Sequence, residues 1–139
     1  MDNDHATRSE TDSIKVFLVE DSPQVLERLS QMVSEIDRVK VVGHAVTYDT
    51  AVHGILSTTP DVVILDIKLA DSSGSGIDVL ARIKPDMPQI KAIMLSNYTS
   101  PKHLEASTKA GADYFLDKSA EFDRIAAILQ TLKYARGYA

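Results

Sequence analysis

The sequence predicts an α/β fold in which one parallel β-sheet is covered by helices on both faces. Three observations favour this fold. Short apolar runs alternate with helical patterns along the chain. The runs at 16–19 and 62–65 are apolar throughout, which is typical of strands buried on both faces of a parallel sheet. Each of these runs ends in acid, Glu20-Asp21 after the first and Asp66 after the second.

The first half of the chain gives three strands and two helices. After the strand at 16–19, Ser22 can cap a helix whose first residue is Pro23. Its apolar stripe has helical spacing and comprises Val25, Leu29, Met32, Val33 and Ile36. A second strand is expected at 39–45 and the third at 62–65. Between them a short helix starts at Thr47 or Asp49 and runs to Leu56, weakened by Gly54.

The second half continues the alternation. The segment 74–76 (Gly-Ser-Gly) is interpreted as the turn that starts the third helix, which ends near Lys84 because a proline follows. Strands are expected at 90–95 and 114–117. The helix between them, 100–110, has one large apolar residue, so we expect it to be held weakly. The last helix is expected to start with Ser119 as its cap and to bury Phe122, Ile125, Ala126, Leu129 and Leu132.

Length and composition fit one globular domain. The chain has 139 residues, of which 44% are apolar and 25% charged. Residues 1–13 are polar without periodicity and are expected to form a disordered tail, which leaves 14–139 as the domain. The absence of cysteine excludes disulfides and thiolate metal sites. With no apolar stretch of about 20 residues and no signal peptide, we expect a cytoplasmic protein without membrane contact. The net charge of −5 argues against direct nucleic-acid binding.

Polar residues that follow the apolar runs suggest a chemistry. Ser96 and Lys118 follow the fourth and fifth strands, so they are expected at the sheet edge that the three acids share. Crowded carboxylates repel one another and favour a bound cation, and oxygen ligands suit Mg²⁺. A cation held by acids, a carboxylate nucleophile, a hydroxyl and a fixed ammonium are the groups needed for phosphoryl transfer.

These residues resemble a known family. Glu20-Asp21, Asp66, Ser96 and Lys118 have the order and spacing of a response regulator receiver domain of two-component signalling, the CheY-like superfamily. The stretch 110–119 is similar to the family's last turn, fifth strand and lysine, and the likeness runs from about 14 to 134. The resemblance implies a stand-alone receiver with a doubly wound (βα)5 three-layer sandwich and the strand order 2-1-3-4-5. The chain ends with the last helix, so no output module is expected to follow.

The resemblance also implies roles in a reaction. Asp66 would accept a phosphoryl group from a sensor histidine kinase or a histidine phosphotransfer protein. Mg²⁺ or Mn²⁺ would be bound by Asp21, Asp66, the main-chain carbonyl of Lys68 and, through water, Glu20. Lys118 and a serine hydroxyl, that of Ser96, would contact the phosphoryl oxygens. Activity of the chain would be limited to its own phosphorylation and dephosphorylation, so it is expected to be a signalling domain and not an enzyme.

A conformational switch is implied as well. Ser96 and Phe115 stand at the family's switch positions, where an aromatic ring turns inward as the hydroxyl moves toward phosphate. The face made by the fourth helix, the fifth strand and the fifth helix would then bind a downstream protein or a second copy of the chain.

Departures from the family pattern leave some points open. Ala70 stands where proline is usual, and Ser119 follows Lys118 where proline often gives a cis peptide. Asn97 and Tyr98, with Lys68, occupy positions that tune phosphate lifetime in the family, and bulk at the first two is expected to slow attacking water. Two other functions stay open: a degenerate receiver that binds proteins constitutively, and an aspartate-nucleophile phosphatase. The phosphatase requires a second acid two residues after the nucleophile, where Lys68 stands.

Overall fold

The computed structural model describes residues 13–70 and 73–138. The predicted tail, 1–13, lies outside these residues except for Ser13. The strands are β1 (Ile14–Val19), β2 (Val39–Ala45), β3 (Val62–Leu65), β4 (Lys91–Ser96) and β5 (Tyr114–Asp117). The helices are α2 (Pro23–Ser34), α3 (Tyr48–Thr58), α4 (Gly76–Ile83), α5 (Pro101–Ala110) and α6 (Arg124–Ala135). No helix of the described residues has the length and apolar character needed to cross a membrane.

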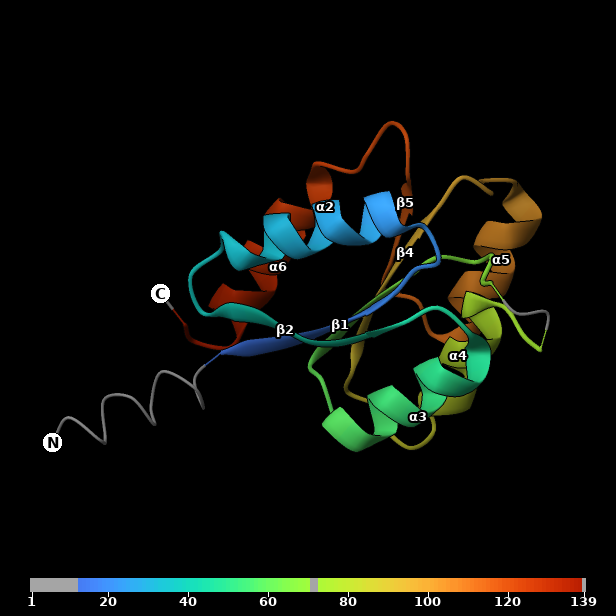
Figure 1. The fold of residues 1–139 in the computed structure, drawn as a ribbon, viewed down its shortest axis with the longest axis horizontal. Coiled ribbons are helices and arrows are strands. Elements are labelled where there is room, and N and C mark those ends of the chain that lie inside the picture. The colour runs from blue at the N-terminus through green and yellow to red at the C-terminus, as the bar shows by residue number, and fades with distance from the viewer. Residues whose placement is uncertain (1–12, 71–72, 139) are drawn as a thin grey trace, which may run out of the picture.

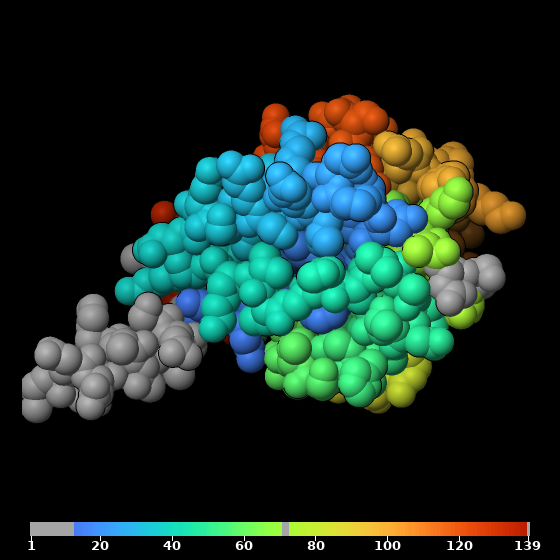
Figure 2. Space-filling model, in the orientation of Figure 1, coloured from blue at the N-terminus to red at the C-terminus, as the bar shows by residue number. Residues whose placement is uncertain are grey.

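The strands form one parallel sheet in the order β2-β1-β3-β4-β5, which confirms the predicted topology. Helices α2 and α6 pack on one face of the sheet, and α3, α4 and α5 lie on the other (Figure 1). The space-filling view from the same side shows the side chains of α2, β2 and α3 closing over β1 (Figure 2). The sheet is therefore the middle layer of a three-layer sandwich.

Alternation along β1 explains why its sequence is apolar without a break. Val16 and Leu18 belong to the apolar cluster under α2 and α6, whereas Phe17 and Val19 belong to the cluster under α3 and α4. Successive side chains of a strand point to opposite faces, so a strand with helices on both sides must be apolar at every position. The same pattern covers all four residues of β3.

Side-chain caps fix the starts of four helices. The first turn of each helix donates a main-chain N–H to a hydroxyl oxygen of the preceding residue, and these residues are Ser22, Thr47, Ser75 and Ser100. Of the two predicted starts of α3, Thr47 is therefore the cap. The Gly-Ser-Gly segment is the turn that starts α4, as expected.

Helix α6 differs from the prediction, whereas helix α5 agrees with it. Helix α6 begins at Arg124, five residues after Ser119, because the N–H groups of Ser119 and Ala120 donate to the side chain of Asp117 and form a separate turn. Helix α5 has the expected bounds and is packed as sparsely as expected, since Leu104 is 47% exposed and Ser107 is the residue that is buried. This helix therefore contributes little to the core.

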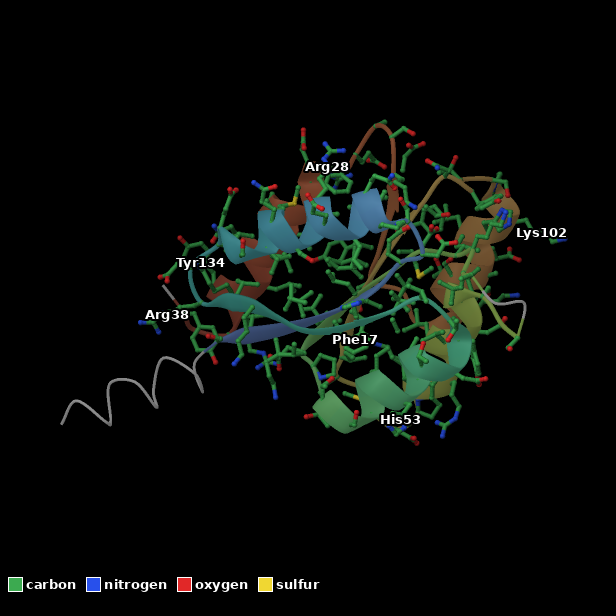
Figure 3. The ribbon with its side chains drawn as sticks, in the orientation of Figure 1. Phe17, Arg28, Arg38, His53, Lys102 and Tyr134 are labelled. Carbon is green, nitrogen blue, oxygen red and sulfur yellow. The ribbon has the colours of Figure 1, made fainter. Side chains whose placement is uncertain are left out.

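Gly54 in α3 has a packing role that the sequence did not indicate. The ring of Phe17 lies between the sheet and α3, and its side chain is 2% exposed (Figure 3). A Cβ atom on Gly54 would come within 2.6 Å of this ring, and one on Gly43 of β2 within 2.7 Å. The two glycines therefore make the space that the ring fills.

Replacing Gly54 by alanine tests this packing. Helix propensity alone would stabilise the variant by about 1 kcal/mol, but overpacking against a buried ring costs about 1–3 kcal/mol. We therefore expect Gly54→Ala to lower the free energy of unfolding in a urea titration. The exposed neighbour His53 serves as the control, because His53→Ala should change stability by less than about 0.5 kcal/mol. A more stable Gly54→Ala protein would contradict the assignment.

Candidate functional site

Three carboxylates converge at the carboxyl ends of β1 and β3. These strands are neighbours, with Val19 paired to Leu65, so the residues that follow them lie side by side. Glu20 and Asp66 are buried, and Asp21 is the most exposed of the three. Each offers a carboxylate oxygen, and these oxygens all lie within 4.8 Å of one another. The structure thus brings together the three acids that the sequence singled out.

Lys118 joins the acids from the end of β5. Its Nζ lies 2.7 Å from Asp66 Oδ2 and 3.0 Å from Glu20 Oε1, and its side chain is 14% exposed. The main-chain N–H of Lys118 donates to the carbonyl of Ser96 at 3.0 Å, which anchors the turn to β4. One ammonium therefore bridges carboxylates from two different strand ends.

Burial and charge shift two pKa values at this site. Burial raises the pKa of Glu20 above its ordinary value, against the opposing hydrogen bonds from Ser22 N–H and Lys118. For Lys118, burial alone would lower the pKa, but the hydrogen bonds to Asp66 and Glu20 and their charges outweigh it, so the pKa is raised. The ammonium consequently stays protonated at neutral pH.

The donor set fits a hard divalent cation. When all three carboxylates are ionised, the single ammonium of Lys118 leaves two negative charges uncompensated. Asp66 Oδ1 is buried and has no hydrogen-bond partner among the described residues, although buried polar atoms are nearly always satisfied. Carboxylate oxygens are the ligands that Mg²⁺ and Mn²⁺ prefer. Glu20, Asp21 and Asp66 could therefore hold such an ion.

Gly76 allows helix α4 to start directly against the main chain of Asp66. A Cβ atom at position 76 would overlap the carbonyl oxygen of Asp66, and the Gly76 N–H donates to the carbonyl of Ile67 at 2.7 Å. From the other side, the N–H of Asp66 donates to Val19 O at 2.9 Å. The sequence pattern indicated only a turn at Gly76, so this role was missed. The side chain of Lys68 is exposed, as expected.

The two predicted switch residues lie at and near the same edge. Ser96 is fully buried at the end of β4, and its Oγ accepts a hydrogen bond from the N–H of Tyr98 at 3.0 Å. Phe115 in β5 is half-buried and packs against the cluster under α3 and α4. The structure describes one conformation, so the switch itself stays a prediction.

Two residues near Lys118 were not predicted. Asp117 Oδ1 accepts hydrogen bonds from the N–H groups of Ser119 and Ala120, at 2.8 and 3.0 Å. Glu121 Oε1 accepts from the N–H of Asp117 at 2.9 Å. An aspartate that bonds the main chain two residues on is a recognised turn pattern, so the Asp-Lys-Ser sequence could have indicated it.

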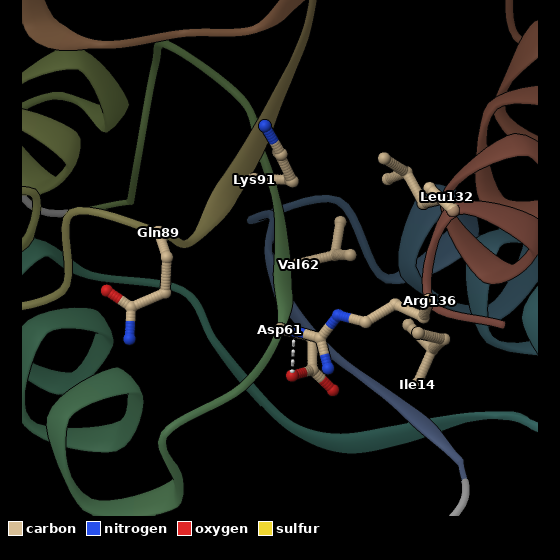
Figure 4. A pocket seen from close by; sticks show the side chains of 8 residues that line it. Ile14, Asp61, Val62, Gln89, Lys91, Leu132 and Arg136 are labelled. Atoms are coloured by element: carbon tan, nitrogen blue, oxygen red, sulfur yellow. Dashed lines mark hydrogen bonds and ion pairs between the residues drawn. The ribbon is translucent and has the colours of Figure 1, made fainter.

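A cavity of about 230 Å³ lies at the opposite end of the sheet (Figure 4). It is bordered by Ile14, Val62 and Lys91, which are the first residues of three parallel strands, and by the end of α6. Asp61 and Arg136 form an ion pair there at 2.7 Å. Because the acids follow the carboxyl ends of the strands, this cavity is separate from the acidic cluster.

Comparison with known proteins agrees with this geometry. Residues 16–130 match the family model of the response regulator receiver domain. The chain is 32% identical over 124 residues to the uncharacterized transcriptional regulatory protein YvfU of Bacillus subtilis. The matched segment covers 88% of this chain and 61% of YvfU. It spans about three-fifths of the length of the curated relatives it matches first.

Solved structures show the same fold. The response regulator domain of Thermotoga maritima CheB superposes with a TM-score of 0.75 at 27% identity, covering 88% of this chain and 95% of that one. The Borrelia burgdorferi CheX-CheY-BeF3-Mg²⁺ complex gives 0.71 at 21% identity, covering 83% and 88%. The chain therefore belongs to the response regulator receiver domain family of two-component signalling.

The pKa of Glu121 gives a test of the turn beside Lys118. It is lowered by the hydrogen bond from Asp117 N–H and then by that from Arg124. The unfolded state thus binds the proton of Glu121 more tightly than the folded state does. The ionised carboxylate therefore stabilises the fold at a pH above its unfolded-state pKa, which is near 4.5. This stabilisation is lost as the pH falls through the lowered pKa of the folded state.

We expect wild type to be more stable than Glu121→Gln at pH 7, with the difference vanishing at acidic pH. Urea titrations at several pH values measure it. The exposed Glu105, 3.7 Å from Lys109, is the control, and Glu105→Gln should change stability less. A Glu121→Gln difference that does not depend on pH would contradict the assignment.

Proposed function

We propose that this receiver accepts a phosphoryl group on Asp66 from a sensor histidine kinase or a histidine phosphotransfer protein. The observation that supports this best is the state of the Asp66 carboxylate. One of its oxygens lies 2.7 Å from the Lys118 ammonium, and the other is buried without a partner among the described residues. A carboxylate held in this way, next to two further acids, is oriented as a nucleophile by one fixed cation.

In the proposed reaction, a carboxylate oxygen of Asp66 attacks phosphorus while the bond from phosphorus to the donor nitrogen breaks. Lys118 then shares its positive charge with the transferred phosphoryl oxygens. The hydroxyl of Ser96 would donate to another of these oxygens once the hydrogen bond from Tyr98 N–H is given up. The product is an acyl phosphate, which water later hydrolyses.

We propose Mg²⁺ or Mn²⁺ as the cofactor, held by Asp21, Asp66, the main-chain carbonyl of Lys68 and, through water, Glu20. When bound, the ion neutralises phosphoryl charge as a Lewis acid. The similar CheX-CheY complex of Borrelia burgdorferi contains Mg²⁺ together with BeF3. The three carboxylates, with oxygens within 4.8 Å of one another and a single ammonium beside them, support the same assignment here.

We further propose that phosphorylation changes the face made by α5, β5 and α6, which then binds a downstream protein or a second copy of this chain. Ser96 and Phe115 would be the residues that move. Two features support this face. Helix α5 buries little besides Ser107, so its packing holds it weakly, and Ser107 Oγ has no partner among the described residues.

Small-donor phosphorylation tests the main proposal. With acetyl phosphate and Mg²⁺, the intact protein should gain the mass of one phosphoryl group, and EDTA should prevent the gain. Asp66→Asn should show no adduct, whereas Asp86→Asn, which changes an exposed acid in an ion pair with Arg82, should behave like wild type. An adduct that survives Asp66→Asn would refute the assignment of the acceptor.

The same measurement separates the other candidate functions. A wild-type protein that takes up no phosphoryl group would favour a constitutive binding module, and release of phosphate from small phosphomonoesters would favour a phosphatase.

Residues next to the site are proposed to set the lifetime of the acyl phosphate. Asn97 and Tyr98 are exposed beside Ser96, and Asn97 Oδ1 accepts a hydrogen bond from Ser119 Oγ at 3.2 Å. Replacing both by alanine should open the site to water and speed the loss of phosphoryl several-fold, measured from intact mass after removal of the donor. Thr99→Ala, in the same exposed loop, is the control. An unchanged rate in the double variant would count against this role.

A further inference from the structure

We propose that Asp117 and Glu121 are positioning residues that hold the main chain around Lys118 and thereby keep its ammonium against Asp66. The inference rests on the proposed phosphoryl transfer and adds two residues to it. The Asp117 carboxylate accepts hydrogen bonds from main-chain N–H groups that follow Lys118, and the Glu121 carboxylate accepts one from the N–H group that precedes it. They would therefore act through Lys118 and not on the phosphoryl group itself.

The position of the Lys118 ammonium depends on its backbone. A lysine side chain is long and has many rotamers, so a shift or loosening of its Cα spreads the positions that Nζ occupies. In the structure Nζ is confined between Asp66 and Glu20 at 2.7 and 3.0 Å. On the β4 side, the backbone is fixed by the hydrogen bond from Lys118 N–H to Ser96 O at 3.0 Å. The main chain that follows Lys118 needs a separate anchor.

Asp117 supplies that anchor. Its Oδ1 accepts hydrogen bonds from Ser119 N–H at 2.8 Å and Ala120 N–H at 3.0 Å, so one carboxylate spans Lys118. No cis peptide occurs among the described residues, so the Lys118–Ser119 bond is trans. The family resemblance implies proline after this lysine, and a proline has no N–H to donate. In this chain, Ser119 donates its N–H instead, and hydrogen bonds replace the ring in shaping the turn.

Glu121 fixes Asp117 in turn. Its Oε1 accepts from Asp117 N–H at 2.9 Å, while its own N–H donates to Asp117 O at 2.8 Å. The other carboxylate oxygen of Glu121 accepts from Nη1 of Arg124 at 2.8 Å, and Arg124 is the first residue of α6. The lowered pKa of Glu121 keeps the carboxylate ionised, and ionised acceptors make the stronger hydrogen bonds. The turn beside Lys118 is thereby joined to a helix.

The alternative is that these bonds stabilise the fold and nothing more. Asp113 allows the two roles to be separated, because it is a matched acid at the other end of β5. Its Oδ2 accepts from Ala92 N–H at 2.9 Å, far along the strand from Lys118. Replacing either aspartate should lower stability, but only the replacement of Asp117 should slow the phosphorylation reaction.

The experiment compares wild type with Asp117→Ala, Asp117→Asn and Asp113→Ala. Phosphorylation by acetyl phosphate at saturating Mg²⁺ should slow about tenfold or more in Asp117→Ala, since small misplacements of a catalytic group have effects of this size. Asp117→Asn should recover most of the rate, because an amide oxygen can accept the same two N–H groups. Asp113→Ala should react like wild type.

Mg²⁺ affinity, followed by thermal stabilisation, should change by less than about twofold in Asp117→Ala, because the metal-binding acids are untouched. A wild-type rate in Asp117→Ala, an Asn variant as slow as the Ala variant, or equal slowing in Asp113→Ala would overturn the inference.

A second readout does not depend on phosphorylation. In NMR spectra of the metal-free protein, the side-chain signals of Lys118 should shift in Asp117→Ala and keep their wild-type positions in Asp113→Ala. Unshifted signals in Asp117→Ala would overturn the inference even in a protein that is phosphorylated normally. If wild type takes up no phosphoryl group but the Lys118 signals shift in Asp117→Ala, the proposed function is rejected and the inferred positioning of Lys118 still holds.

Discussion

The ion pair between Lys118 and the buried carboxylates of Glu20 and Asp66 is the interaction on which the rest of the site depends. Two unit charges of like sign 4 Å apart repel by about 4 kcal/mol at an effective dielectric of 20. Without a cation between them, these two carboxylates would repel each other next to a buried sheet. Lys118 supplies one positive charge to a cluster of three carboxylates. The remaining negative charge is the reason that this cluster is proposed to bind a divalent ion.

Parallel strands make this arrangement possible, and that is why much of it could be predicted. The carboxyl ends of neighbouring parallel strands share one edge of the sheet, so an acid after β1 and another after β3 must meet there. The apolar runs and their acidic ends are visible in the sequence, as are the cap of α2 at Ser22 and the turn that starts α4. The strand order was expected from the family resemblance, since spacing alone does not determine it. The structure confirms this order and brings Lys118 to the same edge as the acids.

Other features were not predicted, because a contact made by the fold, or a rival hydrogen bond nearby in the chain, replaces the local signal. Gly76 looks like an ordinary turn glycine until the carbonyl of Asp66 is seen to lie where its Cβ would be. Ser119 satisfied the local rule for a helix cap, but a competing acceptor, the carboxylate of Asp117, takes its N–H group and delays the helix to Arg124. Lys133 has the pattern of a solvated helix end, yet it is buried with its ammonium donating to the carbonyl of Asp37. In each case a contact distant in sequence, or a rival hydrogen bond, overrides the local signal.

The site and the proposed signalling face differ in how firmly they are held, and this difference matters for function. The acids are fixed by main-chain hydrogen bonds within the sheet, and on the lysine side the turn after β5 is tied to α6 through Glu121 and Arg124. Helix α5, by contrast, buries mainly a serine hydroxyl without a partner among the described residues. A ligand shifts an equilibrium only through its different affinity for the two states. If the site is rigid, the energy of phosphorylation is not absorbed by local adjustment there, and α5, which buries little, is the element that we propose to rearrange. A signal would then pass from the firmly held site to this weakly packed helix.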